Sequence, residues 1–186
     1  MEKTAKRFRS FAEAEKADRD FYKKLTGNER LQILVELLNH GPEQRLERVS
    51  ELLNSRGVDY VIIGAHSLAL HGRPRYTGDL DILVRSTPEN ARLLVDILNE
   101  FGFAESGFKE SDFLKDEQLI EFGRAPTRID LVTGISGVCS EEAFATKVSA
   151  DLDGIPVFVL ARDALIRNKR AVGRPQDLAD LDVLDS

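Results

Sequence analysis

Residues 60–84 read Tyr60-Val-Ile-Ile-Gly-Ala-His-Ser-Leu-Ala-Leu-His-Gly-Arg-Pro-Arg-Tyr-Thr-Gly-Asp-Leu-Asp-Ile-Leu-Val84, with an apolar run at each end. In the second run, Asp79 and Asp81 alternate with leucine and isoleucine. Because successive side chains of a strand point to opposite faces, the two aspartates share one face and the apolar side chains share the other. The stretch therefore predicts a strand, helix, strand unit whose second strand carries two carboxylates about 7 Å apart.

Two carboxylates at this spacing are suited to a metal ion that binds phosphates. They repel each other unless a cation neutralises them. Mg²⁺ prefers oxygen ligands and is usually held by one or two carboxylates together with substrate phosphates. Asp79 and Asp81 are therefore the first candidate metal ligands.

Gly64 follows the first apolar run directly and precedes a predicted short helix. The backbone amides of Ala65, His66 and Ser67 would then point outward at a helix N-terminus, which favours phosphate. The alternative interpretation of Gly64 is a turn that needs the conformational range of glycine.

The loop before the acidic strand carries Arg73, Arg75 and Thr77. Two guanidinium groups beside two carboxylates can hold a polyphosphate through forked hydrogen bonds while a metal ion holds its other oxygens. The alternative is a structural ion pair between either arginine and an aspartate.

A third candidate carboxylate, Asp130, lies in Thr127-Arg-Ile-Asp-Leu-Val132 and points away from the apolar face of that predicted strand. If this strand lies beside the one carrying Asp79 and Asp81, three carboxylates converge, as a two-metal phosphoryl-transfer site requires. Asp130 would then lower the pKa of an attacking hydroxyl or accept its proton. Otherwise it is a solvated surface aspartate.

The 186 residues, 42% of them hydrophobic, are enough for one core. We expect an α/β (α+β) fold with a mixed sheet covered by helices, comprising an N-terminal helical extension at 1–57 and an α/β domain at 58–186 that form one compact unit. The expected strands are 58–63, 79–84, 118–122, 128–132 and 156–160, and the expected helices are three within 8–56 and then 65–72, 87–101, 141–147, 162–170 and 176–184.

Composition excludes several classes of protein. No apolar run approaches the roughly 18 residues of a membrane span, and the N-terminus lacks the apolar stretch of a signal peptide, so a cytoplasmic location without membrane contact is expected. Cys139 is the one cysteine, which rules out an intrachain disulfide or a thiolate zinc cluster. The net charge of −6 argues against nonspecific coating of nucleic acid, although basic residues cluster at 162–174.

The chain resembles the nucleotidyltransferase superfamily typified by DNA polymerase beta, over about residues 58–180, and more narrowly the small bacterial branch near the AbiEii-type toxin nucleotidyltransferases. The motifs that carry the resemblance are Gly64-Ala-His-Ser67, Arg75-Tyr-Thr-Gly-Asp-Leu-Asp81 and Arg128-Ile-Asp130. The resemblance implies that Asp79, Asp81 and Asp130 bind metal and that the glycine segment holds a triphosphate.

The AbiEii-type branch adds a C-terminal lysine and an aspartate, which correspond to Lys169 and to Asp177 or Asp180. Lys169 would contact nucleotide phosphates, or it is a solvated charge on a basic helix. The two aspartates would cap the helix, pair with Arg174 or orient Lys169. One departure is Ala65, because the superfamily commonly has serine or glycine there, and Ser67 is the candidate replacement for the missing hydroxyl.

The resemblance implies an enzyme that moves a nucleoside monophosphate from an NTP to an acceptor hydroxyl. Two Mg²⁺ ions are expected, with Mn²⁺ as an alternative. Gly64 to Ser67, Arg75, Thr77 and Lys169 would bind the nucleotide. The acceptor would be an RNA or tRNA end or a protein side chain, and a cognate toxin or antitoxin would be a partner. The alternative is a catalytically degenerate domain that binds nucleotide, RNA or protein.

Overall fold

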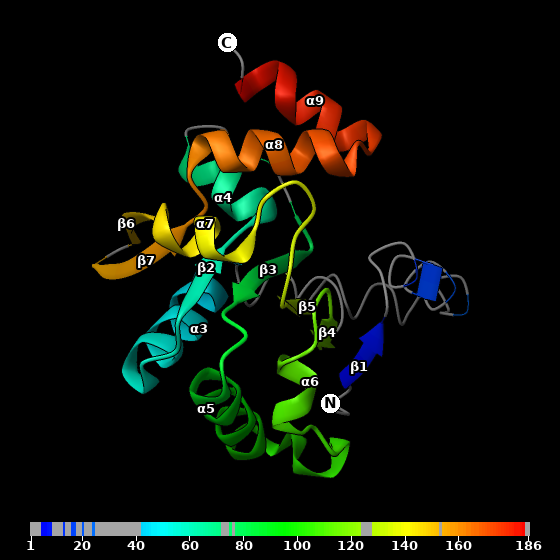
Figure 1. Cartoon of the computed structure of the whole chain (residues 1–186), viewed down its shortest axis with the longest axis vertical. Coiled ribbons are helices and arrows are strands. Elements are labelled where there is room, and N and C mark those ends of the chain that lie inside the picture. The colour runs from blue at the N-terminus through cyan, green and yellow to red at the C-terminus, as the bar shows by residue number, and fades with distance from the viewer. Residues whose placement is uncertain are drawn as a thin grey trace.

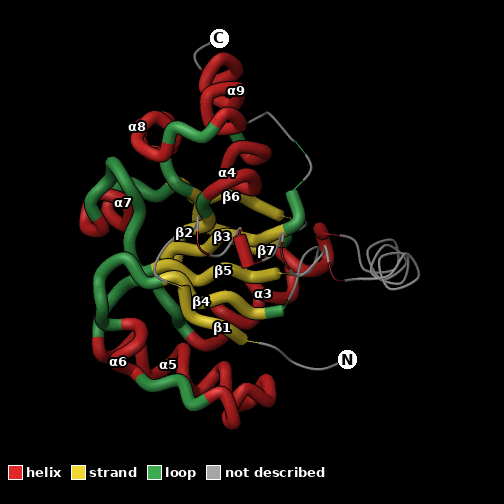
Figure 2. The backbone as a smooth tube through the Cα atoms, turned by 90° about the vertical axis from the view of Figure 1, so that its right-hand side faces the viewer, coloured by secondary structure: helices red, strands yellow, loops and turns green. Residues whose placement is uncertain are grey.

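The computed structural model describes residues 5–8, 13, 16–17, 20, 24, 42–71, 75, 77–123, 128–152 and 154–184. Within these residues, strands form one mixed sheet in the order β1-β4-β5-β3-β2-β7-β6 (Figure 2). The strands are β1 (Ala5–Phe8), β2 (Tyr60–Ile62), β3 (Asp79–Val84), β4 (Leu119–Phe122), β5 (Arg128–Val132), β6 (Val148–Leu152) and β7 (Ile155–Val159). The predicted mixed sheet covered by helices is confirmed.

The helices are distributed among these strands along the chain (Figure 1). They are α3 (Pro42–Arg56), α4 (Gly64–Leu70), α5 (Pro88–Leu98), α6 (Glu110–Phe113), α7 (Ser140–Ala145), α8 (Arg162–Val172) and α9 (Pro175–Leu184), and a π-helical turn (Asn99–Phe103) and a 3₁₀ turn (Ala104–Ser106) follow α5. None of the helices within the described ranges is long and apolar enough to cross a bilayer.

Each face of the sheet has its own hydrophobic core. On one face, alternate strand residues such as Leu80 and Ile82 pack with α3 and α5. On the other face, residues such as Leu83 and Val132 pack with α4, α7, α8 and α9. Because side chains alternate along a strand, Asp79 and Asp81 lie on the same face as Leu83, beneath α8 and α9.

The pairing of the strands places the acidic residues together. β3 and β5 are parallel neighbours, with Asp79 opposite Arg128 and Asp81 opposite Asp130. β5 is antiparallel to β4, with Asp130 opposite Glu121. The prediction that 118–122 and 128–132 pair with each other is confirmed. The condition for the three carboxylates to converge, that 128–132 lies beside the acidic strand, is met.

Local sequence signals explain several boundaries. The Thr87 side chain accepts a hydrogen bond from the Asn90 amide and Pro88 opens α5, as a capping hydroxyl and a first-turn proline predict. At the end of α3, Gly57 has a φ of 69°, which suits glycine as a C-terminal cap.

Two strands were not predicted. β1 pairs antiparallel with β4, with Phe8 opposite Leu119, so residue 8 belongs to a strand where a helix was expected to begin. β6 is an exposed edge strand joined to β7 across Gly154. The alternation of apolar and polar residues in its sequence, Val148-Ser-Ala-Asp-Leu152, was the signal that could have predicted it. Most of the helices predicted before residue 42 lie outside the described residues, and the division at residue 57 stays a prediction.

Candidate functional site

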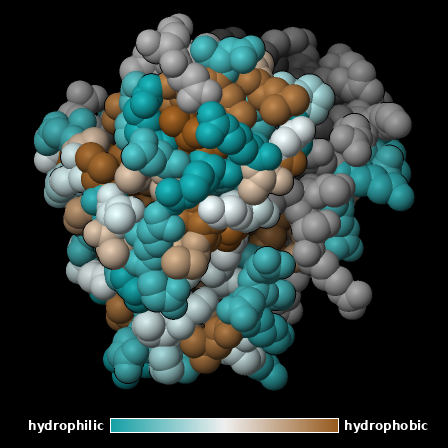
Figure 3. All heavy atoms as spheres, turned by 45° about the horizontal axis from the view of Figure 1, so that its top comes forward, coloured by the Kyte–Doolittle hydropathy of each residue, from teal (hydrophilic) through white to brown (hydrophobic). Residues whose placement is uncertain are grey.

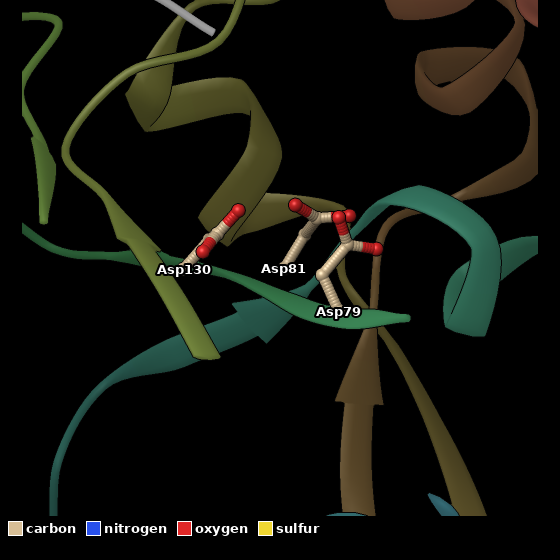
Figure 4. A group of neighbouring side chains, drawn as sticks. All are labelled: Asp79, Asp81 and Asp130. Carbon is tan, nitrogen blue, oxygen red and sulfur yellow. The ribbon is translucent and has the colours of Figure 1, made fainter. Parts of the chain in front are cut away.

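Three carboxylates converge above the sheet. Asp79 and Asp81 extend from β3 and Asp130 from β5, and their side chains point into the same space (Figure 4). One ligand oxygen from each of the three lies within 4.8 Å of the others. The predicted convergence is therefore present, and the three oxygens lie close enough to hold a metal ion.

The carboxylates differ in their hydrogen bonds. Asp79 accepts a bond of 2.5 Å from the Thr77 hydroxyl and one of 2.6 Å from Nη2 of Arg128. Asp130 is fully buried, and within the described residues neither of its oxygens accepts a well-aligned hydrogen bond, although Nε of Arg128 lies 2.9 Å from Oδ1. Buried carboxylate oxygens that lack hydrogen bonds are the chemistry that a cation would complete.

Burial and mutual repulsion raise the pKa values of two of these groups. Removal from solvent, followed by the charge of Asp79, raises the pKa of Asp81 to about 7. Removal from solvent, followed by the charge of Asp81, raises the pKa of Asp130 to about 9, against the opposing charge of Arg128. Without a cation, therefore, the folded protein holds protons in this cluster at neutral pH.

A cavity of about 640 Å³ opens over Asp79 and Asp81, whereas the buried Asp130 is not among its lining residues. Its wall includes Asp79 and Asp81 together with four basic side chains. The described residues that line it are Gly64, Ala65, Arg75, Thr77, Gly78, Asp79, Asp81, Arg128, Asn168, Lys169, Arg174, Pro175, Gln176 and Asp177. Metal-ligand oxygens and several guanidinium or ammonium groups in one cavity are suited to a polyphosphate.

A smaller cavity of about 350 Å³ adjoins this one. Gly64, Asp81, Asn168 and Arg174 line both cavities. Two ligands can therefore approach Asp81 from different sides. A separate apolar cavity of about 510 Å³, lined by Leu52, Leu94 and other residues of the opposite core, lies on the face of the sheet away from the triad.

The predicted glycine segment divides between cavity and core. Gly64 and Ala65 line the larger cavity. Ser67 is fully buried and donates a hydrogen bond to the Leu160 carbonyl, so its hydroxyl does not replace the one missing at Ala65. His66 is half-buried and is not among the residues lining the cavity, whereas His71 contacts the Leu160 carbonyl at 2.7 Å, as expected of a packing histidine.

Lys169 lies inside an ionic cluster between α8 and α9. Only 3% of its surface is exposed, so of the two interpretations of Lys169 the solvated charge is ruled out. Its Nζ lies 2.5 Å from Asp180 and 3.3 Å from Asp177. Of the three uses considered for these aspartates, two are present: both contact Lys169, and Asp177 also pairs with Arg174.

Two arginines complete this cluster. Nε of Arg75 lies 3.0 Å from Asp180, so Arg75 forms an ion pair with α9 while it also lines the larger cavity. Nε of Arg174 lies 2.7 Å from Asp177. The pKa of Asp177 lies below its usual value. Burial alone would raise this pKa, but the hydrogen bond and charge of Arg174 and the charge of Lys169 outweigh the effect of burial. Arg73 lies outside the described residues.

Sequence reasoning missed Glu121 and the role of Arg128. Glu121 is 5% exposed, and its Oε1 lies 3.6 Å from Nη1 of Arg128. The available signal was a charged residue in the middle of the apolar run Leu119-Ile-Glu-Phe122, because a buried charge requires a partner.

No protein-family model and no curated protein matches the chain. Three solved structures are similar to it at a TM-score of 0.49. An antigenic nucleotidyltransferase-like protein from Paracoccidioides brasiliensis is 18% identical, with 76% of this chain and 74% of that chain aligned. A proposed nucleotidyltransferase from Thermotoga maritima is 17% identical, with 86% and 94% aligned. The antibiotic-resistance factor ANT(2″)-Ia is 15% identical, with 76% and 81% aligned.

Proposed function

We propose that this chain is a divalent-metal-dependent nucleotidyltransferase, which moves a nucleoside monophosphate from an NTP to an acceptor hydroxyl. The observation that carries the proposal is the convergence of Asp79, Asp81 and Asp130 beside a cavity lined by basic side chains. The resemblance of the motifs at 64–67, 75–81 and 128–130 to the nucleotidyltransferase superfamily supports the same proposal. The AbiEii-type branch is the narrower form of it.

The three aspartates would hold the metal, with Mg²⁺ favoured and Mn²⁺ as the alternative, because all the available ligands are oxygens. When bound, two such ions would neutralise the triphosphate and lower the pKa of the attacking hydroxyl. The oxygens of Asp130, which accept no well-aligned hydrogen bond from the described residues, and the clustering of like charges fit this requirement.

The residues of the cavity have complementary tasks in the transfer. Arg75, Lys169 and Arg174, with the backbone of Gly64 and Ala65, would hold the triphosphate. The acceptor oxygen bonds to the α-phosphorus, the bond from that phosphorus to the bridging oxygen breaks, and pyrophosphate leaves. Asp130 would accept the proton of the acceptor hydroxyl.

The acceptor is proposed to be an RNA or tRNA end or a protein side chain, with a cognate toxin or antitoxin as partner. Because Asp81 lines both adjoining cavities, the NTP and the acceptor would reach this residue from different sides. The second candidate function is a degenerate domain that binds nucleotide, RNA or protein without turnover. Ala65, which lacks the common hydroxyl, and the buried hydroxyl of Ser67 favour that candidate.

The test is transfer of label from each α-labelled NTP, with Mg²⁺, to total RNA and to cell protein. Asp79→Asn, Asp81→Asn and Asp130→Asn should each abolish transfer. Asp59→Asn is the matched control, because Asp59 pairs with Arg85 and Lys147 outside the cavity. Saturable binding of Mg²⁺ and NTP without any transfer would favour the degenerate domain.

A further inference from the structure

Arg128 occupies an unusual position for a buried cation. It opens β5 directly opposite Asp79 of β3, on the same face as Asp130, and only 6% of its surface is exposed. Its guanidinium group reaches three carboxylates. Nη2 lies 2.6 Å from Asp79, Nε lies 2.9 Å from Asp130, and Nη1 lies 3.6 Å from Glu121. One arginine thus contacts two of the three proposed metal ligands.

Arginine is the side chain least able to relieve this arrangement by losing its proton, because its pKa lies above about 12. The positive charge therefore remains beside the carboxylates at any ordinary pH. A divalent cation that binds the same oxygens must compete with that charge. Glu121, on the neighbouring strand β4, gives the guanidinium an attachment outside the triad.

The other basic residues of the cavity wall have different partners. Among the described residues, Arg75 and Lys169 pair with Asp180, and Arg174 pairs with Asp177. These contacts do not involve the triad. Arg128, in contrast, contacts Asp79 and Asp130 directly, so a metal ion that binds these carboxylates would displace its charge. The same wall would receive the phosphates.

We propose that Arg128 is the built-in counter-ion of the triad and couples metal binding to nucleotide binding. This inference rests on the proposed function. The divalent ion displaces Arg128 from Asp79 and Asp130. The guanidinium group, still paired with Glu121, then binds a substrate phosphate. Metal alone binds weakly because it displaces a cation, whereas metal and triphosphate strengthen each other's binding reciprocally.

The experiment measures Mn²⁺ affinity of the full chain by titration calorimetry and by electron paramagnetic resonance, with and without inorganic triphosphate. Arg128→Gln removes the competing charge, so it should bind Mn²⁺ alone about tenfold more tightly than wild type, within the usual range of coupling between sites. The same variant should lose the enhancement that triphosphate gives to Mn²⁺ binding. Equal or weaker binding of Mn²⁺ alone by a folded Arg128→Gln protein overturns the inference.

Glu121→Gln supplies an independent readout should Arg128→Gln fail to fold. This substitution removes a negative charge, so that Arg128 keeps only its contacts with the triad. Mn²⁺ should therefore bind more weakly than it does to the wild type. Unchanged Mn²⁺ affinity counts against the inference. Arg85→Gln is the control for loss of one positive charge, since Arg85 pairs with Asp59 away from the cavity, and should leave Mn²⁺ affinity unchanged. If the wild type neither binds Mn²⁺ nor transfers a nucleotide, the proposed function itself fails. If the wild type binds Mn²⁺ and transfers a nucleotide, but Arg128→Gln does not bind Mn²⁺ more tightly, only the role of Arg128 fails.

Discussion

Gly64 and Asp81 are packed so closely that a Cβ atom on residue 64 would lie 2.1 Å from Oδ2 of Asp81. Gly64 also has a φ of 63°, in the left-handed region that side chains with a Cβ rarely adopt. Two independent constraints therefore require glycine at the start of α4. One of them acts directly on a proposed metal ligand.

Gly64→Ala should disturb the metal site beyond its effect on stability. The added methyl group must push the Asp81 carboxylate aside, and displacing a ligand's support typically costs about 10- to 100-fold in metal affinity. Mn²⁺ titration of the purified variant measures this loss.

Gly57→Ala is the matched control for this variant. Gly57 has a φ of 69°, but nothing lies within 4 Å of where its Cβ would be. It should lower the free energy of unfolding by about 1 kcal/mol through backbone strain alone, without changing Mn²⁺ affinity. Equal Mn²⁺ affinities for the two variants would show that residue 64 does not constrain Asp81.

The stability of the metal-free protein should fall as pH rises. The folded-state pKa values of Asp81 and Asp130, about 7 and about 9, exceed their ordinary value of 3.8. Between about pH 4 and about pH 9, therefore, the folded state binds more protons than the unfolded state. The contribution of Asp81 and Asp130 to the free energy of unfolding declines as the pH rises through this range. Urea unfolding in EDTA at pH 5, 7 and 9 measures the trend.

Added Mn²⁺ should oppose that trend, because a cation replaces the protons on the carboxylates and binds more tightly as they ionise. The stabilisation by Mn²⁺ should consequently be larger at pH 8 than at pH 5.5. In Asp130→Asn the decline of metal-free stability with pH should be shallower than in wild type. A wild-type protein in EDTA that grew more stable from pH 5 to pH 9 would contradict the assignment.

The central part of the fold and the triad could be predicted from sequence because both depend on local alternation. The strands carrying Asp79, Asp81 and Asp130 have the predicted bounds, 79–84 and 128–132. Alternating apolar and acidic residues specify which face each carboxylate occupies. Convergence then needed only the correct pairing of two strands.

Features that depend on long-range contacts were not predictable in this way. β1 is a strand because its backbone pairs with the edge of β4, more than a hundred residues away along the chain. The burial of Lys169 results from the packing of α9 on α8, which brings two carboxylates to a side chain that sequence alone left with two interpretations. The contact of Arg128 with Glu121 likewise required the order of the strands.

Asn90 should contribute strongly to the stability of the region that holds β3. Its side chain is buried, accepts a bond of 2.8 Å from the Asp59 amide, and donates to the carbonyls of Asp59 and Arg85. Asn90→Ala leaves the Asp59 N–H without its acceptor and removes one of the two hydrogen bonds at each carbonyl, which still accept from the Arg85 and Thr87 amides. It should lower the free energy of unfolding by about 2 kcal/mol. Thr87→Ala, which removes only the helix cap, should cost about 1 kcal/mol in the same urea titration. The reverse order of these two losses would contradict this view of Asn90.

Lys169→Met should destabilise the protein through the buried cluster between α8 and α9. The substitution leaves the buried carboxylates of Asp177 and Asp180 without their shared ammonium group, and breaking a buried pair typically costs about 3–5 kcal/mol. Arg75 and Arg174 still contact these carboxylates, so we expect a loss at the lower end of this range, about 3 kcal/mol, by urea unfolding.

Arg167→Met is the control on the same helix, because the ion pair of Arg167 with Glu142 is exposed and should contribute less than about 1 kcal/mol. Similar losses for the two variants would mean that Lys169 contributes no more than a surface pair, and that the ammonium group is available to a nucleotide at little cost to the fold.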